Sequence, residues 1–360
     1  MYSEIWISRI LLLITMVAVM LWIFAFISRR WSIVFWLETN TKRIIYISIW
    51  LILILSLGMI LINTNFKMAE IFWSGLIWII YAIRVIFPLL IIIDILSIRY
   101  KVPPRIIFII CTIYILLWLY QWIYTKTTPV TITNNKITES HKIVFISDLH
   151  VDAIHHRWYI QRIVHRIQKI QPDLVVIGGD LMNIAKSNYV DAFLPFNDLD
   201  IPVFATLGNH DHMWNANAVS KIFETTKIIP LRNESREINW IQIVGIDDKS
   251  YRSWKNLDEI LQESNIQDNN KFTILISHQP QHLKKLDWFP IDLELAWHTH
   301  NGQFMPLSWI IHAFNDYAYW PYVHWEKTAF VSQGIGSRWA PIRMGTQSEL
   351  VVISLKKEQK

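Results

Sequence analysis

The sequence predicts two parts, an N-terminal domain of four transmembrane helices at residues 1–125 and an α/β domain at residues 141–360. One observation is a change of composition, because Ile, Leu, Trp and Phe dominate up to about residue 125 and a mixed sequence follows. Another is that 52% of the 360 residues are hydrophobic, with a mean hydropathy of +0.27. In the second part, short β-branched runs alternate with helical patterns, as in α/β proteins. Residues 126–140, which are rich in Thr and Asn, are expected to be a linker.

Four apolar stretches are each long enough to span a bilayer, for which a helix needs about 20 residues. They cover residues 5–27, 44–63, 71–93 and 106–124. The first is too long for a secretory signal peptide and lacks a small-residue cleavage site, so we expect it to be a retained helix. Backbone amides in lipid must bond within their own segment, which makes helix the expected form of all four stretches.

The positive charges between the spans predict their orientation. The loops after the first and third spans carry seven basic residues, namely Arg29, Arg30, Lys42, Arg43, Arg99, Lys101 and Arg105. The loop between spans two and three carries only Lys67. Because cytoplasmic loops are enriched in Lys and Arg, we expect an integral protein of the plasma membrane with its α/β domain outside the cytoplasm. Arg84 lies inside the third span and contacts a lipid or phosphate head group, pairs within the bundle, for example with Asp94, or extends its side chain to the membrane interface.

Charge and cysteine content exclude two classes of feature. The formal net charge is +5, and the basic residues are scattered, so the sequence has no basic patch for nucleic acid and no such partner is expected. Cys111 is the single cysteine, so no intramolecular disulfide can form.

The second part consists of β-branched runs that end in polar clusters. Strands are expected at 142–146, 174–177, 203–207, 272–276 and 293–296, and further ones at 238–245, 329–332 and 349–355. Helices are expected at 157–170, where apolar residues recur at helical spacing, and at 215–225 and 253–263. In open α/β sheets ligands collect at the carboxyl ends of the strands. The polar clusters are therefore expected to meet at one edge.

The clusters that follow the first five strands carry eight candidate residues: Asp148, His150, Asp180, Asn209, His210, His278, His298 and His300. Imidazole and carboxylate groups suit divalent transition metals such as manganese, iron or zinc. Each residue alone has an ordinary explanation, since Asp commonly forms turns or caps helices. All five clusters together, each at a strand end, predict a metal site.

This order of motifs resembles the calcineurin-like metallophosphoesterases. Their pattern is D-x-H, G-D, G-N-H-D/E, a lone His and G-H-x-H, and it corresponds here to 148–150, 179–180, 208–211, His278 and 298–300. The resemblance covers about residues 142–356 and implies a two-sheet αββα sandwich. The segments 246–248, 332–336 and 341–343 resemble a membrane-anchored bacterial branch, in which some relatives act on lipid-linked pyrophosphates.

The resemblance also implies a role for each residue. Asp148, His150 and His300 would hold one divalent metal, Asn209, His278 and His298 would hold the other, and Asp180 would bridge them. His210 would stabilise charge or protonate the leaving oxygen, and Asp211 would orient it. The implied reaction is hydrolysis of a phosphodiester, phosphomonoester or pyrophosphate bond by a hydroxide that bridges the metals. The expected partners are the bilayer and a phosphorylated small-molecule or lipid substrate.

One departure from the family pattern affects the last motif. Trp297 stands where the family has Gly, and Asn301 replaces a Gly after the motif, although the ligands are intact. An alternative hypothesis is therefore a catalytically weak metal-binding sensor or scaffold at the membrane. A further alternative, in which the four helices form a transporter, has little support because the helices show no internal repeat.

Two further features have open interpretations. The segment 304–330 is rich in Trp, Tyr and Phe and forms either a lid that docks on the bilayer or an aromatic minicore. Arg338 and Arg343 could each bind phosphate oxygens through the guanidinium fork, and the resemblance favours Arg343 as the substrate contact.

Overall fold

The computed structural model describes residues 104–358 except 153–154, 184–186, 213–215, 239, 250–255, 265, 267–269, 282, 304, 306 and 339–342. The chain divides into two compact units, Met1–Leu119 and Tyr120–Lys360. The three expected spans at 5–27, 44–63 and 71–93, with Arg84 and the basic loops, lie outside the described residues. The orientation in the membrane stays a prediction.

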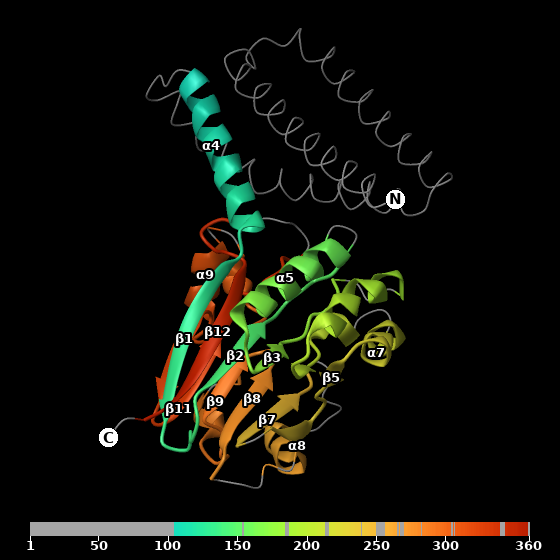
Figure 1. The fold of residues 1–360 in the computed structure, drawn as a ribbon. Helices are drawn as coiled ribbons and strands as arrows, with labels where there is room; N and C mark the ends of the chain where they lie inside the picture. The colour runs from blue at the N-terminus through green and yellow to red at the C-terminus, as the bar shows by residue number, and fades with distance from the viewer. Residues whose placement is uncertain are drawn as a thin grey trace. The chain divides into compact units, whose positions relative to one another are not determined.

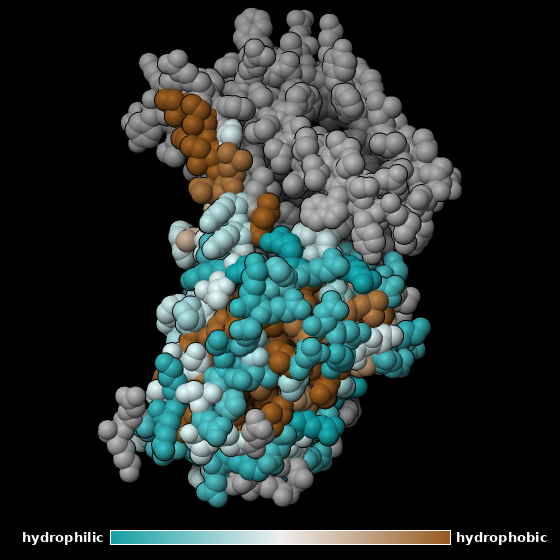
Figure 2. All heavy atoms as spheres, viewed as in Figure 1, coloured by the Kyte–Doolittle hydropathy of each residue, from teal (hydrophilic) through white to brown (hydrophobic). Residues whose placement is uncertain are grey.

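The fourth apolar stretch is helical. Helix α4 covers Pro104–Ile123 and exposes Ile109, Ile113 and Leu116, among other apolar side chains. These side chains form a brown apolar strip in Figure 2, whereas teal side chains cover most of the visible face of the second unit. Within the described part of the chain, no helix combines the length and apolar character that crossing a bilayer requires.

The second unit contains two six-stranded sheets (Figure 1). The strands of the first sheet, in spatial order, are β1 (Lys126–Asn134), β12 (Glu349–Lys357), β2 (His141–Ile146), β3 (Leu174–Ile177), β4 (Val203–Ala205) and β5 (Ile228–Pro230). Those of the second are β10 (Trp320–His324), β11 (Lys327–Val331), β9 (Leu293–Ala296), β8 (Phe272–Ser277), β7 (Ile241–Ile246) and β6 (Glu234–Ile238).

The central strands of each sheet run in the same direction. Strands β2, β3, β4 and β5 pair in parallel in the first sheet, and β7, β8, β9 and β11 do so in the second. Strand β12 is antiparallel to β2, and β6 and β10 are antiparallel edge strands. The carboxyl ends of the parallel strands therefore lie at one edge of each sheet, where their loops carry the predicted motifs.

Three apolar layers hold this unit together. Phe145 and Val176 from the first sheet pack with Ile243, Ile274 and Leu295 from the second, so the two sheets face each other across a buried core. A second layer lies between the first sheet and α5 (Arg157–Ile170), α7 (Ala216–Thr225) and the 3-10 helix η2 (Ser187–Asp198). A third joins the second sheet to α8 (Leu257–Glu263) and η3 (Leu283–Leu286). The expected two-sheet sandwich is therefore confirmed.

Several helices match the sequence prediction closely. Helix α5 has the predicted bounds and buries Ile160, Ile163 and Ile167 on its inner face. Helices α7 and α8 lie within the predicted ranges, and Asn256 caps α8 in a reciprocal pair with Glu259. The helices α6 (Asn209–His212), η4 (His300–Gly302) and α9 (Leu307–Phe314) were not predicted.

Two predictions were wrong. The expected linker contains strand β1, which pairs with β12 in parallel over the whole range Lys126–Asn134. Its β-branched residues suit an edge strand, and its exposed alternate positions gave it the polar composition of a linker. The strand expected at 238–245 is instead a hairpin, because the chain turns between Ile238 and Ile241 and β6 pairs with β7.

Candidate metal centre

The predicted site residues lie in the segments that follow five strands, all at the same edge of the sandwich. Asp148 and His150 follow β2, Asp180 follows β3, and Asn209 begins the short helix after β4. On the second sheet, His278 follows β8, and His298 and His300 follow β9. The structure therefore brings together all the residues that the sequence marked as ligands.

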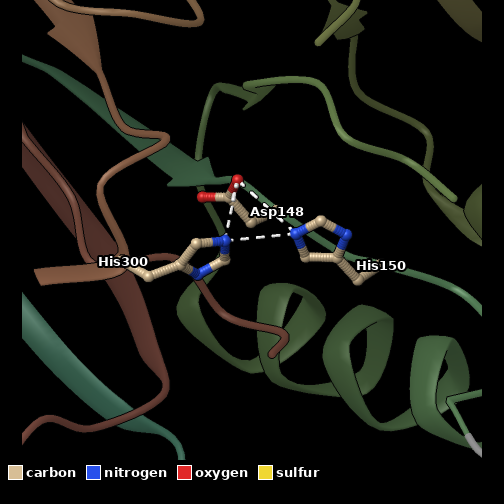
Figure 3. A group of neighbouring side chains, drawn as sticks. All are labelled: Asp148, His150 and His300. Atoms are coloured by element: carbon tan, nitrogen blue, oxygen red, sulfur yellow. Dashed lines mark hydrogen bonds and ion pairs between the residues drawn. The ribbon is translucent and has the colours of Figure 1, made fainter. Parts of the chain in front are cut away.

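The first group of ligands is Asp148, His150 and His300, whose side chains point toward one another (Figure 3). The Nε2 atoms of the two imidazoles are 3.2 Å apart. Oδ1 of Asp148 lies 3.6 Å from Nε2 of His300 and 3.9 Å from Nε2 of His150. Ligand atoms that share one ion lie about 3–4 Å apart because each metal–ligand bond is about 2.1 Å long. The three residues therefore fit a single metal ion.

The second group is formed by His278, His298 and Asn209. Nε2 of His278 lies 2.8 Å from Nδ1 of His298 and 2.9 Å from Oδ1 of Asn209. Together with the carboxylate of Asp180, these side chains form a second candidate set of metal ligands.

Asp180 lies between the two groups. Its Oδ2 is 3.7 Å from Nε2 of His150 and 3.6 Å from Nε2 of His278. Its Oδ1 accepts a hydrogen bond of 2.9 Å from the backbone N–H of His210, which fixes the plane of the carboxylate. This placement is the one that a carboxylate shared by two metal ions requires.

The backbone at the ligands adopts an unusual conformation. Asp148, His150, Asp180, His298 and His300 have φ between 44° and 74°, in the left-handed region that non-glycine residues rarely adopt. Such residues collect at functional sites, where the surrounding structure holds them in place. Here the left-handed turns aim side chains of neighbouring positions into the same space.

Gly208 makes room for the ligands at the end of β4. A Cβ at this position would lie 2.1 Å from Oδ1 of Asp180 and 2.7 Å from Cε1 of His278. Only glycine therefore permits the close approach of the bridging carboxylate to the loop that carries Asn209.

Burial controls the protonation of the carboxyl groups in the absence of metal. It raises the pKa of Asp148 to about 7, and the Ser147 hydroxyl and the charge of Arg343 oppose this shift. It also raises the pKa of Asp180 well above its usual value, with further increases from the nearby charges of Asp148 and Asp211. A divalent cation would reverse these shifts, because it stabilises the ionised carboxylate.

Burial acts on the histidines in the opposite direction. It lowers the pKa of His298 to about 4 and lowers the pKa values of His150, His278 and His300 well below the ordinary range. The imidazoles are therefore neutral at physiological pH, which is the form that binds metals.

His210 is oriented by a backbone carbonyl. Its Nδ1–H donates to the Asn183 carbonyl oxygen over 2.8 Å, and its ring lies edge-on to His150 with the centroids 4.9 Å apart. Asp211, which was expected to orient His210, accepts hydrogen bonds from the backbone N–H groups of Gly208 and Leu181. Its carboxylate thus joins the loop after β3 to the loop after β4, and Asn183 provides the orienting contact.

Trp297 is completely buried beside the second group. Its indole N–H donates to Nδ1 of His278, and its ring covers Gly178, where a Cβ would lie 2.6 Å from the indole. The indole can only donate, so this contact favours the form of His278 whose Nδ1 carries no proton, whereas the hydrogen bond between the ring and the Gly178 backbone raises the pKa of His278. The replacement of glycine by Trp297 therefore influences a metal ligand directly.

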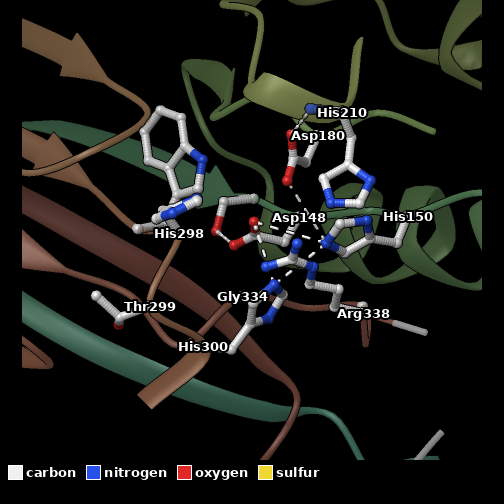
Figure 4. A network of polar contacts seen from close by, with 12 residues as sticks. Asp148, His150, Asp180, His210, His298, Thr299, His300, Gly334 and Arg338 are labelled. Atoms are coloured by element: carbon white, nitrogen blue, oxygen red, sulfur yellow. Dashed lines mark hydrogen bonds and ion pairs between the residues drawn. The ribbon is translucent and has the colours of Figure 1, made fainter. Parts of the chain in front are cut away.

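The two arginines have different surroundings. Arg343, the expected substrate contact, is fully buried, and its guanidinium donates to the carbonyl oxygens of Gln333, Gly334 and Gly336. It supports the loop that packs on Asp148 and is therefore placed as a structural residue. Arg338 instead reaches into the metal centre beside Asp148, His150 and His300 (Figure 4). The sequence did not separate the two arginines, because only the folded loop distinguishes their surroundings.

The residues present fit divalent metals. Oδ1 of Asp148 is buried without a hydrogen-bond partner among the described residues, although it faces the imidazoles of the first group. Buried polar atoms are normally satisfied, so an orphaned carboxylate oxygen among neutral imidazoles indicates a missing cation. The mixture of nitrogen and oxygen ligands suits zinc, manganese or iron.

The chain is similar to proteins that are named as phosphoesterases. Residues 141–313 match the family model described as calcineurin-like phosphoesterase. A metallophosphoesterase of Helicobacter pylori is 29% identical over 238 residues, covering 64% of this chain and 63% of that protein. One of Campylobacter jejuni is 30% identical over 243 residues, covering 64% and 63%. A transmembrane protein with metallophosphoesterase domain of Danio rerio is 31% identical over 258 residues, covering 64% and 57%.

The chain thus spans less than two thirds of the length of these curated relatives. The match begins at the first residue of β2 and includes every strand end that carries a candidate ligand. Family members use divalent metals, in agreement with the candidate ligand groups of the structure. The chain therefore contains a calcineurin-like metallophosphoesterase domain.

Proposed function

We propose that the protein is a metal-dependent phosphoesterase that hydrolyses a phosphodiester, a phosphomonoester or a pyrophosphate bond with two divalent metal ions. The observation that carries this proposal is the position of Asp180, whose Oδ2 lies 3.7 Å from a ligand atom of one group and 3.6 Å from a ligand atom of the other. When bound, two metals supply a water of lowered pKa and stabilise negative charge on the phosphate.

The chain's own residues contribute orientation and proton transfer. Asp180 holds the two groups in a fixed relation, and Gly208 allows it to approach them. His210 presents Nε2 to the site because its Nδ1–H is engaged by Asn183. The ring can hold a proton at that atom and deliver it to the leaving oxygen, a contribution worth about 10²–10⁴-fold in rate.

We further propose that the protein is anchored in the plasma membrane with this domain outside the cytoplasm. The four apolar stretches of the sequence, their basic loops and the apolar surface of α4 support this assignment. Similar proteins named as transmembrane proteins with a metallophosphoesterase domain, from Danio rerio and Bos taurus, give additional support.

A lipid-linked substrate is favoured by the aromatic segment after the last metal motif. Tyr319 is half-buried and bonds to Glu349, as in a minicore, whereas Trp309 and Phe314 on α9 are 66% and 84% exposed. Aromatic side chains with one apolar and one wet side suit a membrane interface. The exposed residues would place a lipid phosphate close to the loop that carries His298 and His300.

The lipid proposal is tested with Trp309→Ser and Trp320→Ser, and with Trp288→Ser, which is 92% exposed after η3, as the matched control. We expect the first two variants to lose activity on phosphate esters in liposomes and to keep activity on a soluble chromogenic ester. Equal losses on both substrates would show that the aromatic residues serve the fold alone.

The phosphoesterase proposal is tested with the metal-stripped full chain in detergent, titrated with manganese in the presence of a chromogenic diester or monoester. Activity should appear with metal and fall by at least about 100-fold in Asp180→Asn and His210→Ala. His210→Ala should keep its metal content, because His210 is the proposed proton donor. A wild-type protein that binds two metals and hydrolyses neither ester would favour a metal-binding sensor or scaffold.

A further inference from the structure

Arg338 carries a cationic side chain that faces the metal centre. Its side chain extends from the loop after Gly336 toward His150, His300 and Asp148 (Figure 4). It is partly exposed, whereas Asp148 and His150 have no exposed surface. Arg338 therefore lies on the solvent side of the ligands, where a substrate has to enter.

The charge of Arg338 affects the pKa values of both carboxylates of the centre. Burial raises the pKa values of Asp148 and Asp180, and the positive charge of Arg338 acts against both increases. Burial lowers the pKa values of His210 and His298, and Arg338 lowers them further. The guanidinium lies beside Asp148, His150 and His300 in Figure 4, so its charge acts at the metal centre.

The backbone of Arg338 is held in place by the loop that carries the last metal motif. The side-chain amide of Gln303 accepts a hydrogen bond of 3.0 Å from the N–H of Arg338 and donates one of 3.2 Å to its carbonyl oxygen. The carbonyl oxygen of Gln303 accepts in turn from the Thr346 hydroxyl. These two hydrogen bonds fix the position and the direction of the Arg338 backbone.

The start of the same loop is fixed to the first ligand group. The N–H of Gly336 donates to the carbonyl oxygen of Asp148 over 2.9 Å, and Arg343 holds the carbonyl oxygens of Gln333 and Gly334. The distance between Arg338 and the ligands is therefore set by the fold.

Divalent metals held by these ligands would repel a nearby guanidinium unless an anion lay between them. Like charges a few ångströms apart repel each other strongly in a partly buried site of low effective dielectric, whereas an intervening phosphate converts the repulsion into two attractions. Guanidinium is also suited to phosphate, since its planar fork donates two parallel hydrogen bonds to two oxygens.

We propose that Arg338 binds the non-bridging oxygens of the substrate phosphate and directs the site toward substrates with a terminal phosphate group. A terminal phosphate has three non-bridging oxygens and close to two negative charges at neutral pH. A diester phosphate has two non-bridging oxygens and one negative charge. The additional oxygen and charge are what an extra guanidinium recognises. This inference rests on the proposed phosphoesterase function and names the substrate class of the same site.

The test compares two chromogenic substrates, 4-nitrophenyl phosphate and bis(4-nitrophenyl) phosphate, with the manganese-loaded full chain. Arg338→Gln should lower kcat/KM for the monoester by about 100-fold and for the diester by less than about 10-fold. The kcat/KM of Arg338→Lys for the monoester should lie between those of wild type and Arg338→Gln, because lysine keeps the positive charge and lacks the planar guanidinium fork. Arg236→Gln, on strand β6 with its side chain 56% exposed, is the matched control and should behave like wild type.

A second readout does not depend on turnover. Titration calorimetry with inorganic phosphate should give at least about 10-fold weaker binding to manganese-loaded Arg338→Gln than to wild type. Elemental analysis should find the same number of metals in both proteins.

The possible results separate the two proposals. Equal losses on both substrates, unchanged phosphate binding, or an additional metal in Arg338→Gln would each overturn the role of Arg338. A wild type that hydrolyses neither ester and still loses phosphate affinity on Arg338→Gln would support the anion site and reject the proposed hydrolysis.

Discussion

Replacing Gly208 with alanine tests whether the packing around the bridging carboxylate sets metal affinity. A Cβ at this position would lie 2.1 Å from Oδ1 of Asp180, 2.6 Å from its backbone nitrogen and 2.7 Å from Cε1 of His278. The conformation of Gly208 lies outside the left-handed region, so these contacts alone oppose the new methyl group. Two of the atoms belong to ligand side chains, and the change therefore acts directly on the metal centre.

The expected effect follows from these distances. Non-bonded heavy atoms are comfortable at about 3.5 Å, so the Asp180 carboxylate has to retreat by about 1.4 Å. Metal–ligand distances tolerate deviations of about 0.2 Å, and a retreat of this size removes Asp180 from at least one ion. We expect manganese to bind about 100-fold more weakly. The overpacking should also lower the free energy of unfolding by about 1–3 kcal/mol.

The assay is calorimetric titration of manganese into the metal-stripped full chain, combined with urea unfolding. Gly245→Ala is the matched control, because its Cβ would lie 2.3 Å from Cβ of Leu231 and 2.8 Å from Cγ2 of Thr206, without touching a ligand. It should lose a similar amount of stability and bind manganese like wild type. If Gly208→Ala also binds manganese like wild type, the position of Asp180 does not determine metal affinity and our interpretation of the site is wrong.

Three further predictions concern protons and buried groups. Because burial raises the pKa of Asp148 to about 7, a proton competes with metal below this pH, and manganese affinity should fall as the pH decreases from 7 to 5 and stay level above about 7.5. Arg343→Met should lower the free energy of unfolding by about 3 kcal/mol, since it leaves buried carbonyl oxygens without a donor. Trp297→Phe should tighten binding of the second metal by about 10-fold, because without the indole donor Nδ1 of His278 is able to hold the ring proton, which leaves Nε2 open to a metal.

Each of these predictions has an outcome that contradicts it. Manganese affinity that does not change between pH 5 and 7 would mean that Asp148 is already ionised in the metal-free protein. A rise in KM in Arg343→Met without loss of stability would restore Arg343 as a substrate contact. Weaker binding of the second metal to Trp297→Phe, measured by calorimetry, would mean that the indole supports His278 as a ligand.

The sequence predicted the metal centre better than the connections around it. Asp148, Asp180 and His278 follow buried, β-branched strands, and parallel strands end at a common edge, so local pattern was sufficient to bring the ligands together. The same reasoning predicted α5 correctly, because one face of this helix is apolar at helical spacing. These features depend on short-range sequence and on a general rule of sheet topology.

Other features depend on contacts between distant segments. The local sequence of strand β1 is typical of a linker. The segment forms a strand because its backbone pairs with β12, more than 200 residues further along the chain. Arg338 and Arg343 are five positions apart, and which of them enters the site is decided by Gln303 and by the carbonyl oxygens of a folded loop. No local pattern contains this information.

The left-handed backbone conformation of the metal ligands lowers the stability of the fold. A non-glycine residue in this region costs about 1–2 kcal/mol, and five ligands share the conformation. Glycine at any of these positions would release that energy, so drift toward greater stability would erase the ligands one by one. A gain in unfolding free energy for metal-free His298→Gly would measure how strongly the conformation of the ligands and the stability of the fold compete there.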